Sequence, residues 1–115
     1  VFMEGAVTYS NEAKMKRLGV KPETLKNYGA VSAETALEMA EGIAKSAGTS
    51  VGLSTTGVAG PGPSEGKPEG LVYVGIYING RTFVKELHLA GKRNVIRERA
   101  AYSALDYLRR KILLD

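Results

Sequence analysis

Hydrophobic and polar positions follow two different periods along this chain of 115 residues. Apolar residues at every second position, or on both faces of a short segment, are typical of β-strands, whereas spacings of three and four are typical of helices. The first pattern predicts four strands, at residues 1–8, 50–56, 71–78 and 82–89. The second predicts four helices, at residues 11–18, 22–28, 33–47 and 92–112.

Residues that favour helix ends support these boundaries. A serine before a helix can accept a hydrogen bond from the first turn, and Ser10 and Ser32 stand at two of the predicted starts. Pro22 suits the first turn of the second helix because its ring fixes φ. Glycines follow the first three helices, at positions 19, 29 and 48, where a left-handed conformation commonly ends a helix.

The segment 71–78 is apolar on both faces, which predicts a central strand covered from two sides. Asn79-Gly80 is a strong hairpin signal, so the next strand should return antiparallel. The last helix should bury an apolar stripe formed by Ile96, Ala100, Ala104, Leu108 and Ile112. Together these patterns predict one α/β domain over residues 1–115, a three-layer α/β/α sandwich with a mixed sheet.

The loop between the second and third predicted strands, residues 55–70, is rich in glycine and proline. It contains five of the 14 glycines and three of the 4 prolines. A loop of this length inside a compact domain is usually a binding element or disordered. Because it follows a buried strand, it could hold a small ligand. A flexible surface loop is an equally weighted alternative.

Composition narrows the possible chemistry. The absence of cysteine excludes disulfides and thiolate nucleophiles, and it fits a cytoplasmic protein. A single histidine, His88, argues against an imidazole metal site or a Ser-His-Asp triad. The net charge of +4 is spread along the chain, and its densest cluster, residues 109–111, ends a helix. We therefore expect no specific nucleic-acid partner, and no apolar run is long enough to predict a membrane span.

The spacing of Tyr9 and Lys14 suggests a catalytic base. If Ser10 caps the helix, these two positions meet as a hydrophobic staple at a strand-to-helix junction. A partly desolvated amine has a lowered pKa and could act as a general base. In the alternative interpretation, the lysine stem simply packs on the tyrosine while its ammonium group stays in water.

Groups that could bind an anion occur in two further segments. The segment 55–62 supplies hydroxyls and unhindered backbone N–H groups, which suit a phosphate or a developing oxyanion. Arg93 and Arg97 begin the last helix, where a cation opposes the helix dipole and hints at an anionic partner. A solvated helix face also explains them. The scattered acidic residues give no metal-ligand spacing, so no metal is expected. No cofactor is expected either.

Several motifs occur in the order seen in one known family. They are Glu-Gly-Ala-Val-Thr-Tyr-Ser-Asn-Glu-Ala-Lys at 4–14, Leu-Gly-Val at 18–20, Gly-Ala-Val-Ser at 29–32, Thr-Gly-Val-Ala-Gly-Pro-Gly at 56–62, Lys-Pro-Glu-Gly at 67–70 and Arg-Glu-Arg-Ala at 97–100. In these motifs the chain resembles the CinA C-terminal family, which comprises nicotinamide-nucleotide amidases (PncC) and the C-terminal domains of competence/damage-inducible CinA proteins. The resemblance covers essentially the whole chain.

The resemblance implies an α/β/α sandwich that hydrolyses nicotinamide mononucleotide to nicotinate mononucleotide and ammonia without a metal. It also implies a serine nucleophile with a lysine base, a part that falls to Lys14, with Tyr9 hydrogen-bonded within the proton relay. The residues that the resemblance places near the substrate are Asn11, Thr56, Gly57, Gly60, Gly62 and Arg97, the last of them toward the phosphate. A small nucleotide is thus the expected partner, and a homo-oligomer the expected assembly.

The chain departs from the family at the nucleophile. Family members carry it in a Glu-Ser-Cys-Thr-Gly-Gly motif upstream of the region matched here, and this chain has no such motif. Ser10, Ser32, Ser50 and Ser54 lie in other contexts. We therefore expect a truncated amidase domain that is inactive alone, with an open sheet edge that favours self-association. The alternative is a non-catalytic nucleotide-binding or interaction module of a competence-associated protein.

Overall fold

The computed structural model of the protein describes residues 5–6 and 10–114. Its helices are α1 (Asn11–Leu18), α2 (Pro22–Tyr28), α3 (Ala33–Ala47) and α4 (Arg93–Leu114). Its strands are β1 (Val51–Gly57), β2 (Leu71–Ile78) and β3 (Arg81–His88). Each helix and strand predicted after residue 10 is present, and each end lies within two residues of its prediction.

The predicted helix caps are confirmed. The Ser10 hydroxyl accepts a 3.1 Å hydrogen bond from the N–H of Ala13, and the Ser32 hydroxyl accepts one of the same length from Thr35. Gly19 ends α1 with φ at +71°, a conformation that costs glycine little because it has no Cβ. These local signals need no tertiary partner, which is why the sequence alone locates the first helices.

The three strands form an antiparallel sheet in the order β1-β2-β3. The central strand β2 is buried on both sides, as its apolar pattern predicts. Asn79 and Gly80 join β2 to β3 with φ of +48° and +87°, the pair of positive values that a two-residue type I′ hairpin turn requires. A mixed sheet also requires a parallel pair, and every pair among the described strands is antiparallel.

Most of the predicted first strand, residues 1–8, lies outside the described residues. Gly5 and Ala6 are described and belong to no helix or strand. Ala6 packs against the apolar cluster that joins α1 to α3. The prediction of a strand at residues 1–8 is therefore not tested. The fold class is α/β.

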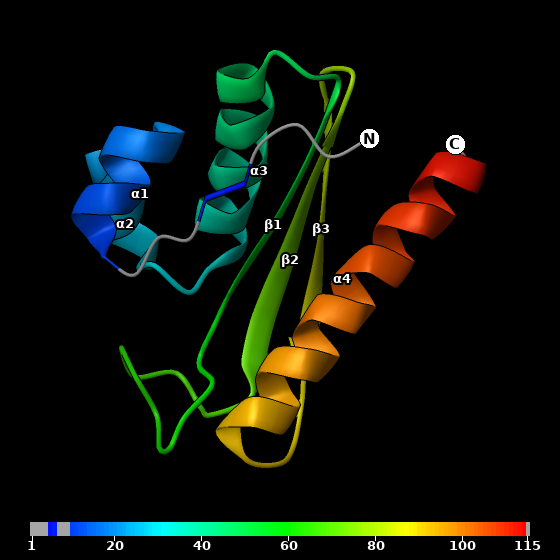
Figure 1. Ribbon diagram of the computed structural model, residues 1–115. Coiled ribbons are helices and arrows are strands. Elements are labelled where there is room, and N and C mark those ends of the chain that lie inside the picture. The colour runs from blue at the N-terminus through cyan, green and yellow to red at the C-terminus, as the bar shows by residue number, and fades with distance from the viewer. Residues whose placement is uncertain (1–4, 7–9, 115) are drawn as a thin grey trace.

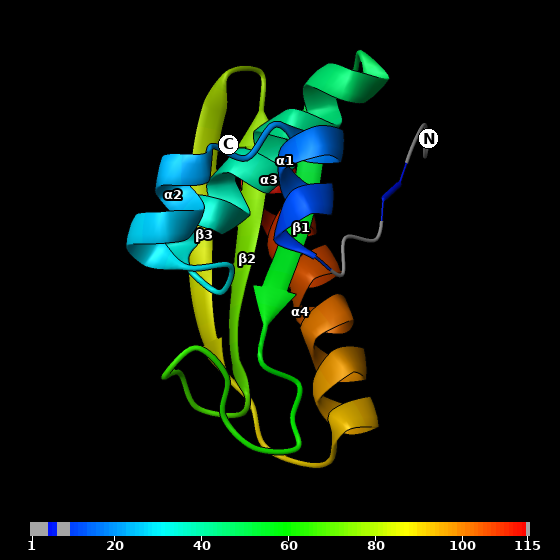
Figure 2. The ribbon, with the colours of Figure 1, turned by 90° about the vertical axis from the view of Figure 1, so that its left-hand side faces the viewer.

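The helices cover both faces of the sheet, so the layers are α/β/α. Figure 1 shows α1, α2 and α3 on one side of the sheet and α4 on the other, and Figure 2 views the same layers from the α1–α3 side. Helix α3 lies unusually close to the strands. A Cβ on Gly52 would lie 2.0 Å from the carbonyl oxygen of Ala40, and one on Gly75 would lie 2.3 Å from that of Ala36. Glycine at these positions sets the distance between the layers.

Helix α4 buries the first part of its predicted stripe. Ile96, Ala100 and Ala104 are buried against the sheet, as predicted. The prediction is wrong for Ile112, whose exposed fraction is 54%. Figure 1 gives the reason, because α4 diverges from the sheet toward its C-terminal end. No helix among the described residues is long and apolar enough to cross a membrane.

Candidate functional site

Lys14 is a buried lysine near the middle of α1. Only 8% of its surface is exposed, which is rare for a lysine because the charged form loses hydration. Burial lowers the pKa of Lys14, and the negative charge of Glu65 acts in the opposite direction. A lowered pKa increases the fraction of neutral amine near neutral pH, and the neutral amine is the form that can accept a proton.

The turn between α2 and α3 holds two charged side chains of the glycine-rich loop. Glu65 accepts hydrogen bonds of 3.1 Å from the backbone N–H groups of both Ala30 and Val31. Lys67 donates to the carbonyl oxygen of Tyr28 at 2.6 Å and also to that of Val31. The loop is therefore docked on this turn by one acidic and one basic residue.

Gly29 makes this docking possible. Its φ is +83°, and a Cβ there would lie 3.0 Å from a carboxylate oxygen of Glu65 and 3.1 Å from the amine of Lys67. Its carbonyl oxygen accepts hydrogen bonds from the hydroxyls of Ser32, at 3.0 Å, and Thr35, at 2.7 Å. The turn thus has polar partners from both the loop and α3, which fixes its shape.

Thr56 has a structural partner in the same turn. Its hydroxyl is mostly buried and donates a 2.7 Å hydrogen bond to the carbonyl oxygen of Ala30. This contact ties the end of β1 to the turn that Glu65 also holds. The hydroxyl proton of Thr56, a residue predicted to lie at the substrate, is therefore already engaged by the protein itself.

Two of the predicted glycines of the loop, Gly60 and Gly62, lie against the carboxylate of Glu69. The N–H of Gly62 donates a 3.1 Å hydrogen bond to Glu69. A Cβ on Gly60 would lie 2.5 Å from the Glu69 carboxyl group, and the Gly60 carbonyl oxygen accepts a 2.7 Å bond from Arg93. Arg93, considered above as a contact for an anionic ligand, instead anchors this loop to the start of α4.

Gly57 and Arg97 lie together at a cavity of about 270 Å³. The cavity lies between β1 and the first half of α4, and Thr55 and Ala101 also contribute to its lining. A Cβ on Gly57 would lie 2.7 Å from the Val72 side chain, so this glycine also permits close approach of β1 and β2. Lys14 does not line this cavity, because α1 belongs to the layer on the other side of the sheet.

Two predicted site residues remain, Tyr9 and Asn11. Tyr9 lies outside the described residues, so its staple with Lys14 is untested. Asn11 is the first residue of α1 and is exposed. Among the described residues, no group of three or more histidine, aspartate or glutamate side chains is placed to hold a metal ion.

Sequence reasoning missed the roles of Glu65, Lys67 and Glu69. All three lie in the glycine-rich loop, where charged side chains among glycines and prolines indicate specific partners rather than a helix face. The partners of the first two are 34 to 39 positions away along the chain. No local pattern identifies a partner at that separation.

Comparisons with known proteins point to the same family as the sequence motifs. A family model described as the CinA C-terminal domain matches residues 1–112. A CinA-like protein of Kosmotoga olearia is 67% identical over 114 residues, which are 98% of this chain and 28% of that protein. A putative competence-damage inducible protein of Clostridium botulinum is 65% identical over 113 residues, which are 97% of this chain and 28% of that protein. The chain thus spans 28% of the length of these relatives.

Solved structures share the fold. The crystal structure of a competence-damaged protein (CinA) superfamily member from Klebsiella pneumoniae 700603 superposes with a TM-score of 0.91 at 31% sequence identity. The superposition covers 94% of this chain and 68% of that chain.

Proposed function

Because the chain belongs to the CinA C-terminal domain family, we propose that it is part of a nicotinamide-nucleotide amidase domain in which Lys14 is the general base. The substrate is nicotinamide mononucleotide, and the products are nicotinate mononucleotide and ammonia. The observation that carries the proposal is the burial of Lys14, which lowers the pKa of its amine. A neutral lysine is the base that a Ser-Lys hydrolase needs.

In the proposed reaction, the neutral amine of Lys14 takes the proton of a serine hydroxyl as the serine oxygen attacks the amide carbon. The protonated lysine then gives that proton to the leaving nitrogen, which departs as ammonia. A water molecule attacks the resulting ester and loses a proton to Lys14. Lys14 then returns this proton to the departing serine oxygen, which regenerates the serine and the neutral lysine and releases nicotinate mononucleotide. Tyr9 would hydrogen-bond within this relay.

We place the nucleophile outside these 115 residues. Three of the four serines considered above already have structural partners. Ser10 and Ser32 cap helices, and Ser54 donates a 2.6 Å hydrogen bond to the carbonyl oxygen of Ala36. Ser50 lies just before β1, exposed to solvent. Because the chain has no cysteine, none of its serines, Ser46, Ser64 and Ser103 included, lies in the family's Glu-Ser-Cys-Thr-Gly-Gly motif.

Arg97 is proposed to meet the substrate phosphate at the cavity that it shares with Gly57. Arg97 and Lys14 lie on opposite sides of the sheet. A substrate that contacts both would have to pass around the edge of β1, which is unpaired among the described strands. The proposal thus predicts that this edge of β1 forms part of the substrate path.

The test is ammonia release from nicotinamide mononucleotide by the full-length protein that contains this chain. We expect activity that Lys14→Ala abolishes. The matched control is Lys16→Ala, because Lys16 lies on the same helix but is exposed and pairs with Glu12 at 2.7 Å. If the folded full-length protein releases no ammonia, the proposed amidase activity is wrong.

The second candidate is a non-catalytic nucleotide-binding module of a competence-associated protein. The separation of the Arg97 cavity from Lys14 favours it, because a cavity can bind a nucleotide without a base beside it. Calorimetry with the same substrate distinguishes the two. Binding that Arg97→Gln weakens, without ammonia release from the full-length protein, would support the module.

A further inference from the structure

Helix α4 carries a row of exposed side chains on its face away from the sheet. Glu98 and Tyr102 are exposed, and each lies two positions before a buried alanine, which is about 200° round a helix. Figure 1 shows α4 alone on its side of the sheet, so no other described helix or strand lies beyond this face. The members of this row, the α4 stripe, are Val95, Glu98, Tyr102, Leu105, Arg109 and Ile112, all of them exposed.

Four of the six members of the stripe are large apolar residues. Tyr102 and Leu105 are the most exposed of the four and lie at the centre of the stripe, whereas Val95 and Ile112 lie at its ends. Burial of such side chains against another apolar surface is favourable. Neighbouring exposed apolar groups therefore commonly mark an interface with another protein.

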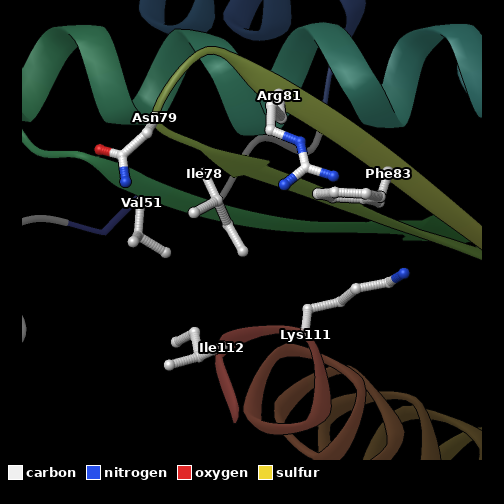
Figure 3. A pocket seen from close by; sticks show the side chains of 7 residues that line it. All are labelled: Val51, Ile78, Asn79, Arg81, Phe83, Lys111 and Ile112. Atoms are coloured by element: carbon white, nitrogen blue, oxygen red, sulfur yellow. The ribbon is translucent and has the colours of Figure 1, made fainter. Parts of the chain in front are cut away.

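The C-terminal end of the stripe stays accessible, although it lies near the hairpin. Figure 3 shows Lys111 directed from α4 toward Phe83, with its amine 4.4 Å from the ring centre. Ile112 follows Lys111 and therefore lies about 100° further round the helix. It lines the edge of the space between α4 and the hairpin, yet more than half of its surface is exposed. Ile112 can therefore contact a partner that approaches from outside.

The spacing of the stripe is the same in both directions along the chain. Successive members are three, four, three, four and three positions apart, and this alternation is typical of the seam along which two helices pack in a coiled coil. Because the order of the spacings is a palindrome, two copies of the stripe can meet position by position when the helices run in opposite directions. In this register Tyr102 meets Leu105 of a second copy. Val95 meets Ile112 of the second copy.

The two charged members of the stripe favour the antiparallel arrangement. Glu98 meets Arg109 of the second copy, and a two-fold axis repeats the contact. In a parallel pair each residue would meet its own copy, which would place like charges together. Arg109 already binds Asp106 of its own helix at 3.0 Å, but a guanidinium has five N–H donors and can bind a second carboxylate.

We infer that α4 binds a second copy of the chain as an antiparallel two-fold pair along the α4 stripe. Tyr102 and Leu105 form the centre of the contact. Two ion pairs between Glu98 and Arg109 fix its register. Lys14 lies on the other side of the sheet, so the pair forms whether or not the chain belongs to an amidase.

The test is chemical cross-linking of the full-length protein that contains this chain. Val95→Cys and Ile112→Cys are introduced together, and a short bifunctional maleimide is added. We expect a covalent dimer, because each cysteine meets the other position of the second copy. Within one molecule the two positions are 17 residues apart, about 26 Å along the helix, so the reagent cannot join them. This chain itself has no cysteine, and the full-length protein without the two changes measures the background.

Each cysteine alone is the control for the direction of the helices. In Val95→Cys or Ile112→Cys by itself, like positions of the two copies lie about 26 Å apart in the antiparallel register. We therefore expect no dimer above background from either single change. A parallel pair would instead place like positions side by side, and both single changes would cross-link.

Charge reversals test the register. In the two-cysteine protein, Glu98→Arg and Arg109→Glu should each slow cross-linking about tenfold, because two attractive pairs become repulsive. The two reversals together should restore the rate, since opposite charges meet again. The matched control is Arg110→Glu, which should leave the rate unchanged. Arg110 is exposed and also binds Asp106 at 3.0 Å, but it lies about 100° round the helix from Arg109.

Three outcomes would overturn the inference. If the two-cysteine protein is folded by circular dichroism and gives no dimer, the stripe does not face a second copy. A dimer from either single-cysteine protein would mean that the copies meet in another register. A loss of cross-linking that the combined reversal does not restore would mean that Glu98 and Arg109 do not pair.

Discussion

The carboxylate of Glu65 accepts a 3.1 Å hydrogen bond from the backbone N–H of Val31, 34 positions earlier in the chain. This contact docks the glycine-rich loop on the turn between α2 and α3. Glu65 also brings a negative charge into the electrostatic environment of Lys14, where it opposes the effect of burial on the pKa of the amine. The loop and the proposed base are thus linked through one acidic side chain.

Replacing Glu65 should change the titration of Lys14. In Glu65→Gln, the loss of the negative charge should lower the pKa of Lys14 further, because less remains to favour the charged amine. The measurement is a pH titration of the Lys14 side-chain NMR signal. Glu23→Gln, an exposed change in α2, should leave that pKa unchanged. A higher pKa in Glu65→Gln would contradict the electrostatic role.

The buried amine should also make stability depend on pH. The pKa of Lys14 is lower in the folded state than its ordinary value of about 10.5, so the unfolded state binds more protons between the two values. The free energy of unfolding should therefore rise with pH across that window, relative to Lys14→Met, and the gain should be lost as pH falls through the folded-state pKa. Urea denaturation at pH 7 to about 10.5 measures the difference. A pH-independent difference would contradict the burial of the charge.

Gly52 should tolerate no larger side chain. Gly52→Ala places a Cβ 2.0 Å from the carbonyl oxygen of Ala40, and the resulting shift of α3 should lower the free energy of unfolding by about 1–3 kcal/mol. Gly19→Ala is the control. No atom lies within 4 Å of a Cβ there, and only the strain of φ at +71° remains, about 1 kcal/mol. Equal losses measured by denaturation would mean that the layers can separate easily.

Neighbouring threonines should differ in their effect on stability. Thr56→Val removes the hydroxyl that binds the carbonyl oxygen of Ala30, and it should cost about 1–3 kcal/mol of unfolding free energy. Thr55→Val, at an exposed position of the same strand, should cost little. Calorimetric unfolding compares the two. A negligible loss in Thr56→Val would leave its hydroxyl available for the proposed substrate.

Self-association is expected through α4. Tyr102 is 79% and Leu105 61% exposed, on a helix whose opposite face packs on the sheet, and exposed apolar clusters commonly mark interfaces. Sedimentation at increasing concentration should detect an oligomer that Leu105→Glu dissociates. Lys92→Glu, an exposed change just before the same helix, should not dissociate it. If the protein sediments as a monomer at all concentrations, the prediction of a homo-oligomer is wrong.

Sequence patterns alone determined the helices and strands after residue 10. Ser10, Ser32 and Asn79-Gly80 act through hydrogen bonds or backbone angles within a few residues. The local sequence is therefore enough to predict their effects. The apolar stripe predicted the burial of Ile96 and Ala104 but not the exposure of Ile112, because periodicity does not say where a helix leaves the sheet.

Tertiary structure decided which candidate residues meet. It separated Lys14 from the Arg97 cavity by placing their helices on opposite faces of the sheet. It engaged Thr56 and the N–H of Gly62 with protein partners, and it brought Glu65 and Lys67 to a turn more than 30 positions away. The physical reason is that local conformation depends on neighbours in the chain, whereas burial, docking and a shifted pKa depend on groups that only folding brings together.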